Sequence, residues 1–224
     1  MEEEGRIKRV LEHTRVVRPP RQKLATFGSS VVEYWVVTEL GGNMTVVRDG
    51  KVTAERPRIV TPSYLVKAEG FSEQARGYIK MMAREHPREA GIFYRYRNEP
   101  GGMDVVSESL TQVINRLDVW LDEVGNQLSA IIKGVEELWD VSLLMFIYEL
   151  TQSSLYTHIN EFRRLGSFDI DSAGVPQDAR NYIEDLFEQV RTDLSRAPYL
   201  VNELNRWDLF SEYEDRFLAL FRGK

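Results

Sequence analysis

Cysteine is absent from the 224 residues, and histidine occurs only three times, at His13, His86 and His158. The lack of cysteine excludes disulfides, thiolate zinc sites, iron–sulfur clusters and cysteine nucleophiles, and it is compatible with a reducing compartment. None of the histidines follows a glutamate at the Glu-x-x-His spacing of di-iron bundles. We therefore expect neither a metal nor a cofactor.

Long apolar runs are missing as well. The longest nearly apolar run, over 141–150, is interrupted by Ser142 and Glu149 and is about half as long as the roughly 20 residues of a membrane-spanning helix. The segment Met1-Glu2-Glu3-Glu4-Gly5 lacks the basic and apolar regions of a secretory signal. We expect a cytoplasmic protein that has no membrane partner.

Motifs for nucleotides and calcium are missing or incomplete. Neither the glycine-rich P-loop motif nor the dinucleotide-binding motif G-x-G-x-x-G occurs, which excludes the familiar nucleotide folds. The segment 169–180 matches a calcium loop at Asp169, Asp171 and Gly174, but Arg180 stands where calcium requires a bidentate glutamate. We expect a plain loop between two helices.

Charge is distributed unevenly along the chain. Residues 1–98 carry 18 Lys or Arg against 12 Asp or Glu, whereas residues 99–224 carry 11 against 23. The change falls at 98–102, where a Pro-Gly-Gly run is typical of a linker. The predicted divisions are a basic N-terminal arm over 1–23, a small α+β domain over 24–98 and an acidic helical bundle domain over 103–224.

The N-terminal half has the pattern of a small antiparallel sheet. The segment 31–40 is rich in β-branched residues, and its two alternating sets of positions have the two-residue period of a strand, while Gly41-Gly42-Asn43 predicts a turn. One set is Val32, Tyr34, Val36, Thr38 and Leu40, and the other is Val31, Glu33, Trp35, Val37 and Glu39. Asp49-Gly50 favours a type I′ turn between strands over 44–48 and 51–55, with Val47 opposite Val52.

A helix over 72–86 and a strand over 92–97 complete the predicted order β-β-β-α-β. On that last strand Tyr94 and Tyr96 point to one side while Arg95 and Arg97 point to the other, so rings and charges do not share a surface. This separation weakens the case for a surface that binds single-stranded nucleic acid.

The C-terminal half is patterned as helix, since no Gly or Pro occurs between Val135 and Leu165. We favour one long helix that continues through Gly125, although the sequence leaves open whether 105–165 forms one helix or two. Further helices begin near Pro176, with Ile183, Phe187 and Val190 inward, and near Pro198. The heptad-spaced apolar positions of the long helix are Leu110, Ile114, Leu117, Leu121, Val124, Leu128, Ile131, Val135 and Leu138.

The sequence favours a non-enzymatic interaction or assembly module of α+β class, acting through its helical bundle. The expected partner is another protein or a second copy of the chain. The predicted interface residues are Leu117, Leu121, Val124 and Leu128.

Two alternatives stay open. Ser154, His158 and Glu161 lie on one side of a helix and could serve a hydrolase or transferase with a site between the two halves, although side chains stacked on one helix rarely form a triad. The basic arm could bind nucleic acid, or it could lie against acidic residues of its own chain. Its candidate residues are Arg6, Lys8, Arg9, Arg15, Arg18, Arg21 and Lys23.

Overall fold

The computed structural model describes residues 2–65, 80–81, 83–86 and 88–222. The chain forms two compact units, each described here by itself. The sheet unit is Met1–Pro57 with Tyr94–Asn160, and the helical unit is Arg58–Phe93 with Glu161–Lys224. The predicted α+β class, with an N-terminal sheet followed by a helical region, is confirmed.

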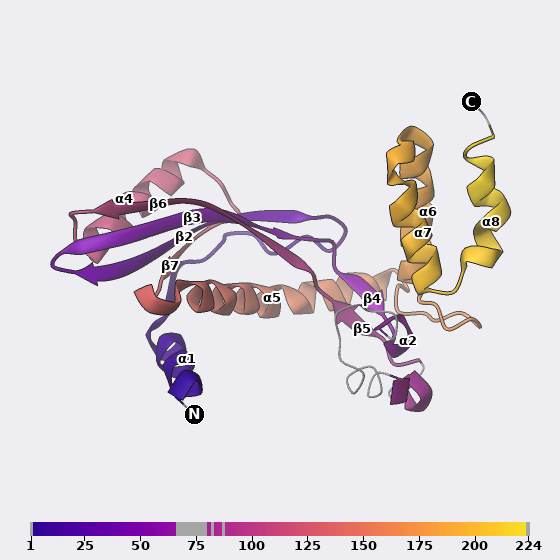
Figure 1. Ribbon diagram of the computed structural model, residues 1–224, viewed down its shortest axis with the longest axis horizontal. Coiled ribbons are helices and arrows are strands. Elements are labelled where there is room, and N and C mark those ends of the chain that lie inside the picture. Colours follow the sequence, from indigo (N-terminus) through magenta and orange to yellow (C-terminus); the bar gives the residue numbers. More distant parts are fainter. Residues whose placement is uncertain (1, 66–79, 82, 87, 223–224) are drawn as a thin grey trace. The chain divides into compact units, whose positions relative to one another are not determined.

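Five strands of the sheet unit form a sheet in the order β1-β7-β2-β3-β6 (Figure 1). Neighbouring strands are antiparallel except β2 and β7, which run parallel. The predicted strand over 31–40 is present as β2, and the predicted turn joins it to β3. The bounds are β1 Arg15–Arg18, β2 Ser30–Gly41, β3 Met44–Ala54, β6 Tyr96–Val106 and β7 Ser129–Lys133.

Helices cover both faces at the centre of this sheet (Figure 1). On one face Leu121 of α4 shares a buried apolar core with Ile131 of β7, and on the other Phe146 of α5 shares a core with Ile132. Both faces of β7 are therefore buried, which explains its apolar sequence. The helical elements are α1 Glu2–His13, α4 Leu110–Val124, the 3-10 turn η1 Glu136–Leu138 and α5 Trp139–Arg164.

The predicted continuous helix over 105–165 is wrong, because the chain leaves the helical conformation between α4 and α5. Ser109 starts α4 with a capping box, and Gly125 ends it with a φ of 73°. Ile131 and Ile132 then lie in β7, between β1 and β2. A short apolar run has the same composition in a buried strand as in a helix, so the heptad spacing did not distinguish them.

The predicted hairpin turn at Asp49-Gly50 is also wrong. Both residues lie inside β3, and Val47 lies opposite Val37 of β2 instead of Val52. A Cβ on Gly50 would collide with the hydroxyl of Tyr34, which is buried. The glycine therefore permits a close approach between side chain and backbone and does not form a turn.

The predicted linker over 98–102 is wrong as well, since these residues belong to β6. Pro100-Gly101-Gly102 lies across from Asp49-Gly50, where the register between β3 and β6 shifts. The backbone N–H of Gly102 donates to the Asp49 carboxylate at 3.0 Å. Two segments that look like separate turns in the sequence thus form one bulge across two strands.

The helical unit combines a two-stranded sheet, β4 with β5, and several helices. Residues 80–81 and 83–85 of the predicted helix over 72–86 are helical, and 72–79 and 82 lie outside the described residues. The predicted strand over 92–97 is divided between β5 and β6. The bounds are β4 Arg58–Val60, α2 Pro62–Leu65, β5 Gly91–Phe93, α6 Gln177–Thr192, η2 Leu194–Arg196, α7 Ala197–Arg206 and α8 Phe210–Ala219.

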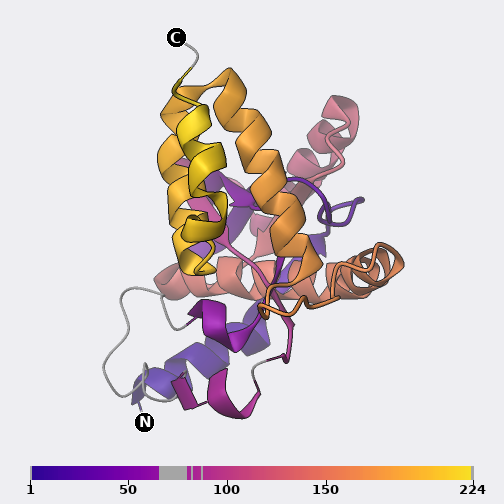
Figure 2. The same cartoon turned by 90° about the vertical axis from the view of Figure 1, so that its right-hand side faces the viewer.

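Figure 2 shows α6, α7 and α8 side by side in the helical unit. The single helix predicted after Pro198 is divided, since Asp208 has a φ of 57° between α7 and α8. α8 is held on α6 by Arg216, which pairs with Glu184 and lies over the Phe187 ring at 4.1 Å.

None of the described helices has the length and apolar character needed to cross a membrane. The predicted inner face of α6 is buried at Ile183, Phe187 and Val190.

An ion pair holds the start of α5 on the sheet. Arg48 of β3 donates to both carboxylate oxygens of Glu136 in η1, at 2.8 and 2.6 Å, and the Thr38 hydroxyl donates to the same carboxylate. The hydrogen-bonded Arg48 guanidinium keeps the pKa of Glu136 below its usual range. Glu136 is therefore a charged group whose environment favours ionisation.

We predict that Gly50→Ala lowers the free energy of unfolding by about 1–3 kcal/mol, because the added methyl group must displace the Tyr34 side chain or the backbone of Glu99. Urea denaturation followed by circular dichroism measures the change. Gly28→Ala is the matched control, since no atom lies within 4 Å of a Cβ there. Equal effects of the two substitutions would show that Tyr34 does not constrain β3.

Acid should remove the stability contributed by Arg48 and Glu136. A carboxyl with a depressed folded-state pKa stabilises the fold above its unfolded pKa of about 4.3 and loses that effect as the pH falls through the folded value. We predict that Glu136→Gln costs roughly 1–2 kcal/mol at neutral pH and that this cost shrinks towards about pH 3. Urea denaturation across that pH range tests it. The control, Glu137→Gln, changes an exposed neighbour, and an identical pH profile for both variants would contradict the prediction.

Candidate functional site

Two of the predicted catalytic candidates are fully buried on α5. The Ser154 hydroxyl donates to the Leu150 carbonyl at 2.8 Å and accepts from the Leu24 N–H at 3.1 Å. Nε2 of His158 lies 2.9 Å from the Leu24 carbonyl, and Nδ1 lies 2.8 Å from the Tyr94 hydroxyl. A carbonyl only accepts, so Nε2 carries the proton and Nδ1 accepts from Tyr94. Ser154 and His158 together satisfy both backbone groups of Leu24.

The geometry of a catalytic triad is not formed at these residues. Nucleophilic catalysis needs a hydrogen bond from serine to a base and a second bond that orients the base. The Ser154 hydroxyl is bonded to backbone, and within the described residues no hydrogen bond joins Glu161 to Ser154 or His158. The structure therefore brings Ser154 and His158 to one backbone segment and does not bring Glu161 to them.

Two tyrosines extend this network to the start of β6. The rings of Tyr94 and Tyr96 stack with centroids 6.4 Å apart, and the Tyr96 hydroxyl is hydrogen-bonded to Thr151 of α5. Burial raises the pKa of Tyr94 to about 12, so its hydroxyl stays a donor. Arg95 and Arg97 are exposed and pair with glutamates. This arrangement agrees with the predicted separation of the rings from the charges.

The predicted basic arm is folded into the sheet unit. β1 pairs with β7, and Arg18 is buried beside α4, where its guanidinium pairs with Asp118 and Asp122. The hydrogen bond from Arg18 lowers the pKa of Asp122. Arg21 also pairs with Asp122, and Arg6 pairs with a glutamate of η1. The alternative that the arm lies against acidic residues of its own chain is confirmed for these three arginines.

The other nucleic-acid candidates lie on the surface of α1, β1 and the segment that follows β1. Arg15 donates to the carbonyls of Glu12 and Thr14. Nucleic-acid binding stays a prediction. The exposed candidates are Lys8, Arg9, Arg15 and Lys23.

The four predicted interface residues do not share one exposed seam. Leu121 is fully buried, and Leu117 packs against the same core beneath α4. Val124 is exposed at the end of α4, whereas Leu128 lies beyond the helix and packs against the core beneath α5. Leu117 and Leu121 therefore stabilise the sheet unit itself, and Leu121 is not accessible to a partner.

Residues 169–176 form the predicted loop between two helices, whereas 177–180 are already the first turn of α6. Asp171 accepts from the N–H groups of Ala173 and Val175 and pairs with Arg180 at 2.7 Å. Arg180, which replaces the calcium-binding glutamate, thus neutralises the aspartate of its own loop. Across the described ranges of the chain, no group of three or more side chains suited to hold a metal ion was found.

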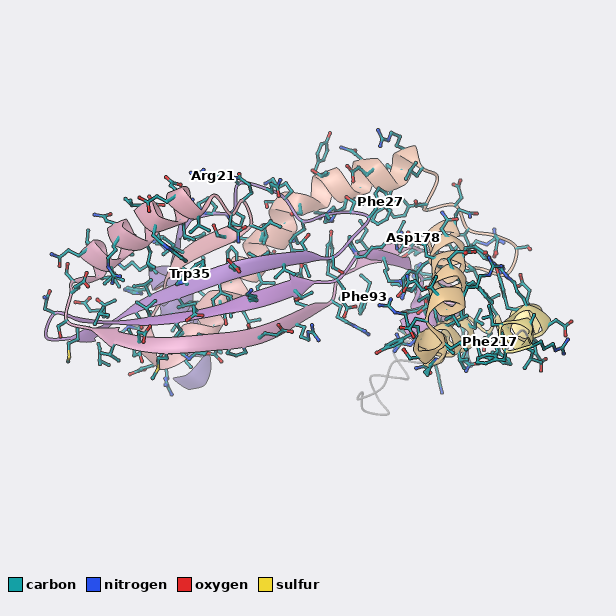
Figure 3. All side chains as sticks on the ribbon, turned by 90° about the horizontal axis from the view of Figure 1, so that it is seen from above. Arg21, Phe27, Trp35, Phe93, Asp178 and Phe217 are labelled. Atoms are coloured by element: carbon teal, nitrogen blue, oxygen red, sulfur yellow. The ribbon has the colours of Figure 1, made fainter. Side chains whose placement is uncertain are left out.

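Within the described part of the chain β6 is a free edge of the sheet, since it pairs with β3 on one side and ends the strand order (Figure 3). All of its side chains are exposed except those at its two ends, which are half-buried. Met103 is 62% exposed and Val105 is 53% exposed. The opposite edge, β1, has only 4 residues. β6 is thus the long accessible edge of the sheet unit.

A groove of about 390 Å³ lies beside the β3–β6 bulge. One wall contains Trp35 of β2, labelled in Figure 3, and Trp120 of α4, whose rings meet edge to face with centroids 5.5 Å apart. The groove also contains one lysine, Lys51. Its residues come from four elements, so no local sequence pattern indicated it. Its carboxylates belong to Glu33, Asp49 and Glu99.

No family model matches the chain, and no curated protein and no solved structure matches it either. The functional inference therefore depends on the exposed surfaces of the fold. Among these, the β6 edge and the adjoining groove belong to one unit.

We predict that His158→Leu lowers the free energy of unfolding by about 1–3 kcal/mol, because the buried Leu24 carbonyl and Tyr94 hydroxyl lose their partner. Urea denaturation measures the loss. Tyr156→Leu on the same helix is the matched control, since Tyr156 is 76% exposed and its replacement should change little. A His158→Leu variant as stable as the wild type would mean that this network contributes nothing to the fold.

Proposed function

We propose that this protein is a non-enzymatic interaction module that binds an extended segment of another protein along β6. One observation carries the proposal: β6 has 11 residues, is exposed, and is paired on one side only. The outer N–H and C=O groups of such a strand form hydrogen bonds with an added strand. The surface is the sheet edge, which replaces the helical seam predicted from the sequence.

Apolar side chains next to the edge support strand addition. Met103 lies opposite Arg48 and Val105 opposite Val46, and residues paired in this way point to the same face of a sheet. Met44 is also exposed, near the end of β6. These residues offer apolar contacts to alternate side chains of a bound segment, in addition to the main-chain bonds.

The bulge limits how much of the edge is suited to pairing. Pro100 and the register shift interrupt β6 near its middle, a feature that prevents uncontrolled association of sheet edges. The stretch 102–106 beyond the bulge is paired in regular register from Met103 onwards. It extends about 17 Å, which suits a short peptide segment.

Charge favours a basic segment over a second copy of this chain. Glu99 and Asp104 lie on β6, and Asp49 lies across from its bulge, with Arg97 paired to Glu99. A second copy would bring its own acidic groove to the same edge, and like charges oppose association. A segment carrying arginine or lysine would be attracted instead.

The proposal includes the cytoplasmic location predicted from the sequence, which is compatible with the absence of cysteine. It does not include the hydrolase or transferase alternative. The hydrogen bonds of Ser154 and His158 support this choice, because they are made to backbone and to Tyr94.

Selection from a random library of displayed short peptides against the full chain tests the proposal. Enriched peptides are expected to slow amide hydrogen exchange at alternate residues of 102–106, namely those whose N–H groups point away from β3. Methylation of alternate backbone nitrogens in the same peptides should abolish binding, because strand pairing needs those N–H groups. No enrichment, or protection confined to other elements, would refute the proposal.

A pair of matched variants locates the surface. Val105→Asp on β6 should weaken peptide binding by about tenfold through loss of apolar contact. Val119→Asp on α4, where the valine is 61% exposed, should leave binding unchanged. Sedimentation of the free chain tests the competing occupant: a dimer that Val105→Asp dissociates would identify a second copy as the partner.

A further inference from the structure

The groove between β2, β3, β6 and α4 adjoins the edge at which we propose that a segment binds. Glu99 lines the groove from β6, and Asp49 lines it from β3. A strand added to β6 would run about 5 Å away from it. Side chains of that strand that point to the α4 face therefore lie next to the mouth of the groove.

Three carboxylates and one lysine line the groove, and Arg97 outside the lining pairs with Glu99, so that among the described residues Asp49 has no cationic partner. Glu33 is neutralised, because it pairs with Lys51 at 3.1 Å and accepts from Asn126 at 2.8 Å. Asp49 and Glu99 are each engaged at one oxygen only, by the Gly102 N–H and by Arg97 respectively. In the part of the chain that the structure describes, nothing bonds to Oδ2 of Asp49 or Oε2 of Glu99. These two oxygens can accept from a cationic donor.

The aromatic wall adds a second requirement for the occupant. Trp120 is 45% exposed although it is one of the largest apolar side chains, and its ring meets Trp35 edge to face. An exposed indole ring attracts a cation through its negative face. The occupant should therefore combine positive charge with a flat surface that can lie on an indole.

Arginine meets both requirements better than other cations do. Its guanidinium is planar, stacks on aromatic rings and donates several hydrogen bonds at once to carboxylates. A lysine ammonium is a strongly hydrated point charge without a flat face. Divalent metal ions are a poorer match, since the described residues form no group of three or more side chains suited to hold one.

We infer that this groove binds an arginine side chain of the extended segment paired with β6. The inference rests on the proposed function for the source of the arginine. It makes the module selective: the edge binds an extended backbone, and the groove selects segments with an arginine beside the bulge.

The test uses short capped peptides of alternating threonine and valine that carry arginine, citrulline or lysine at one central position. Citrulline has the shape of arginine without its charge. We expect the arginine peptide to bind the full chain about tenfold more tightly than the citrulline peptide, with lysine between them. NMR titration of the indole N–H signals measures binding, and only Trp35 and Trp120 of the four tryptophans should shift.

Charge-neutral variants of matched size identify the groove. Glu99→Gln and Asp49→Asn should each weaken arginine-peptide binding by about three- to tenfold and leave the citrulline peptide unchanged. Asp104→Asn is the control, because it removes one carboxylate from the same strand outside the groove. Equal weakening by all three would mean that overall charge, and not the groove, attracts the peptide.

Failure of the groove and failure of the proposed function give different results. If all three peptides protect the β6 amides equally and none shifts Trp120, the edge binds segments and the arginine inference is wrong. If the arginine peptide shifts Trp35 and Trp120 while no β6 amide is protected, the groove binds arginine and strand addition is wrong. Shifts confined to Trp139 or Trp207 would overturn both.

Discussion

Burial of β7 on both faces is the constraint on which the sheet unit depends. Ile131 and Ile132 point to opposite faces and each needs an apolar cover. α4 and α5 provide these covers at the centre of the sheet, and they leave β6 exposed along most of its length. β6 is thus accessible because the two helices do not extend over most of it. The bulge at Pro100 and Asp49 limits the length of β6 that can pair with another strand.

Buried polar groups impose a second constraint, and it explains a pattern that resembles catalysis in the sequence. Leu24 is buried and lies outside the helices and strands, so the backbone pairing of a helix or sheet does not satisfy its N–H and C=O groups. Ser154 and His158, one helical turn apart, provide one partner each. A serine and a histidine at that spacing can therefore serve only to hydrogen-bond backbone groups. The hydrogen-bond partners of the hydroxyl and of the ring nitrogens distinguish this structural role from a catalytic one.

The hydrophobic periodicity within a single helix or strand was predictable from the sequence. The pairing of residues on different strands was not. The alternation in β2 and the inner face of α6 at Ile183 and Phe187 were predicted because each depends on one element. Asp49-Gly50 and Pro100-Gly101-Gly102 were misassigned because their glycines accommodate tertiary neighbours. Ile131 of β7 fitted the heptad spacing by chance. The groove gathers Trp35 and Trp120 from different elements, so its prediction requires the fold itself.

The place of β1 in the sheet has a consequence for how the chain folds. β2 pairs with β3 and β3 pairs with β6, in both cases antiparallel. β1 pairs with β7, so that Arg15 lies opposite Lys133. Contacts between residues so distant in sequence close large loops and slow folding. During synthesis β1 cannot pair until β7 has left the ribosome, and Arg18 cannot form its ion pairs until Asp118 and Asp122 have been synthesised. Docking of β1 therefore follows the synthesis of β7.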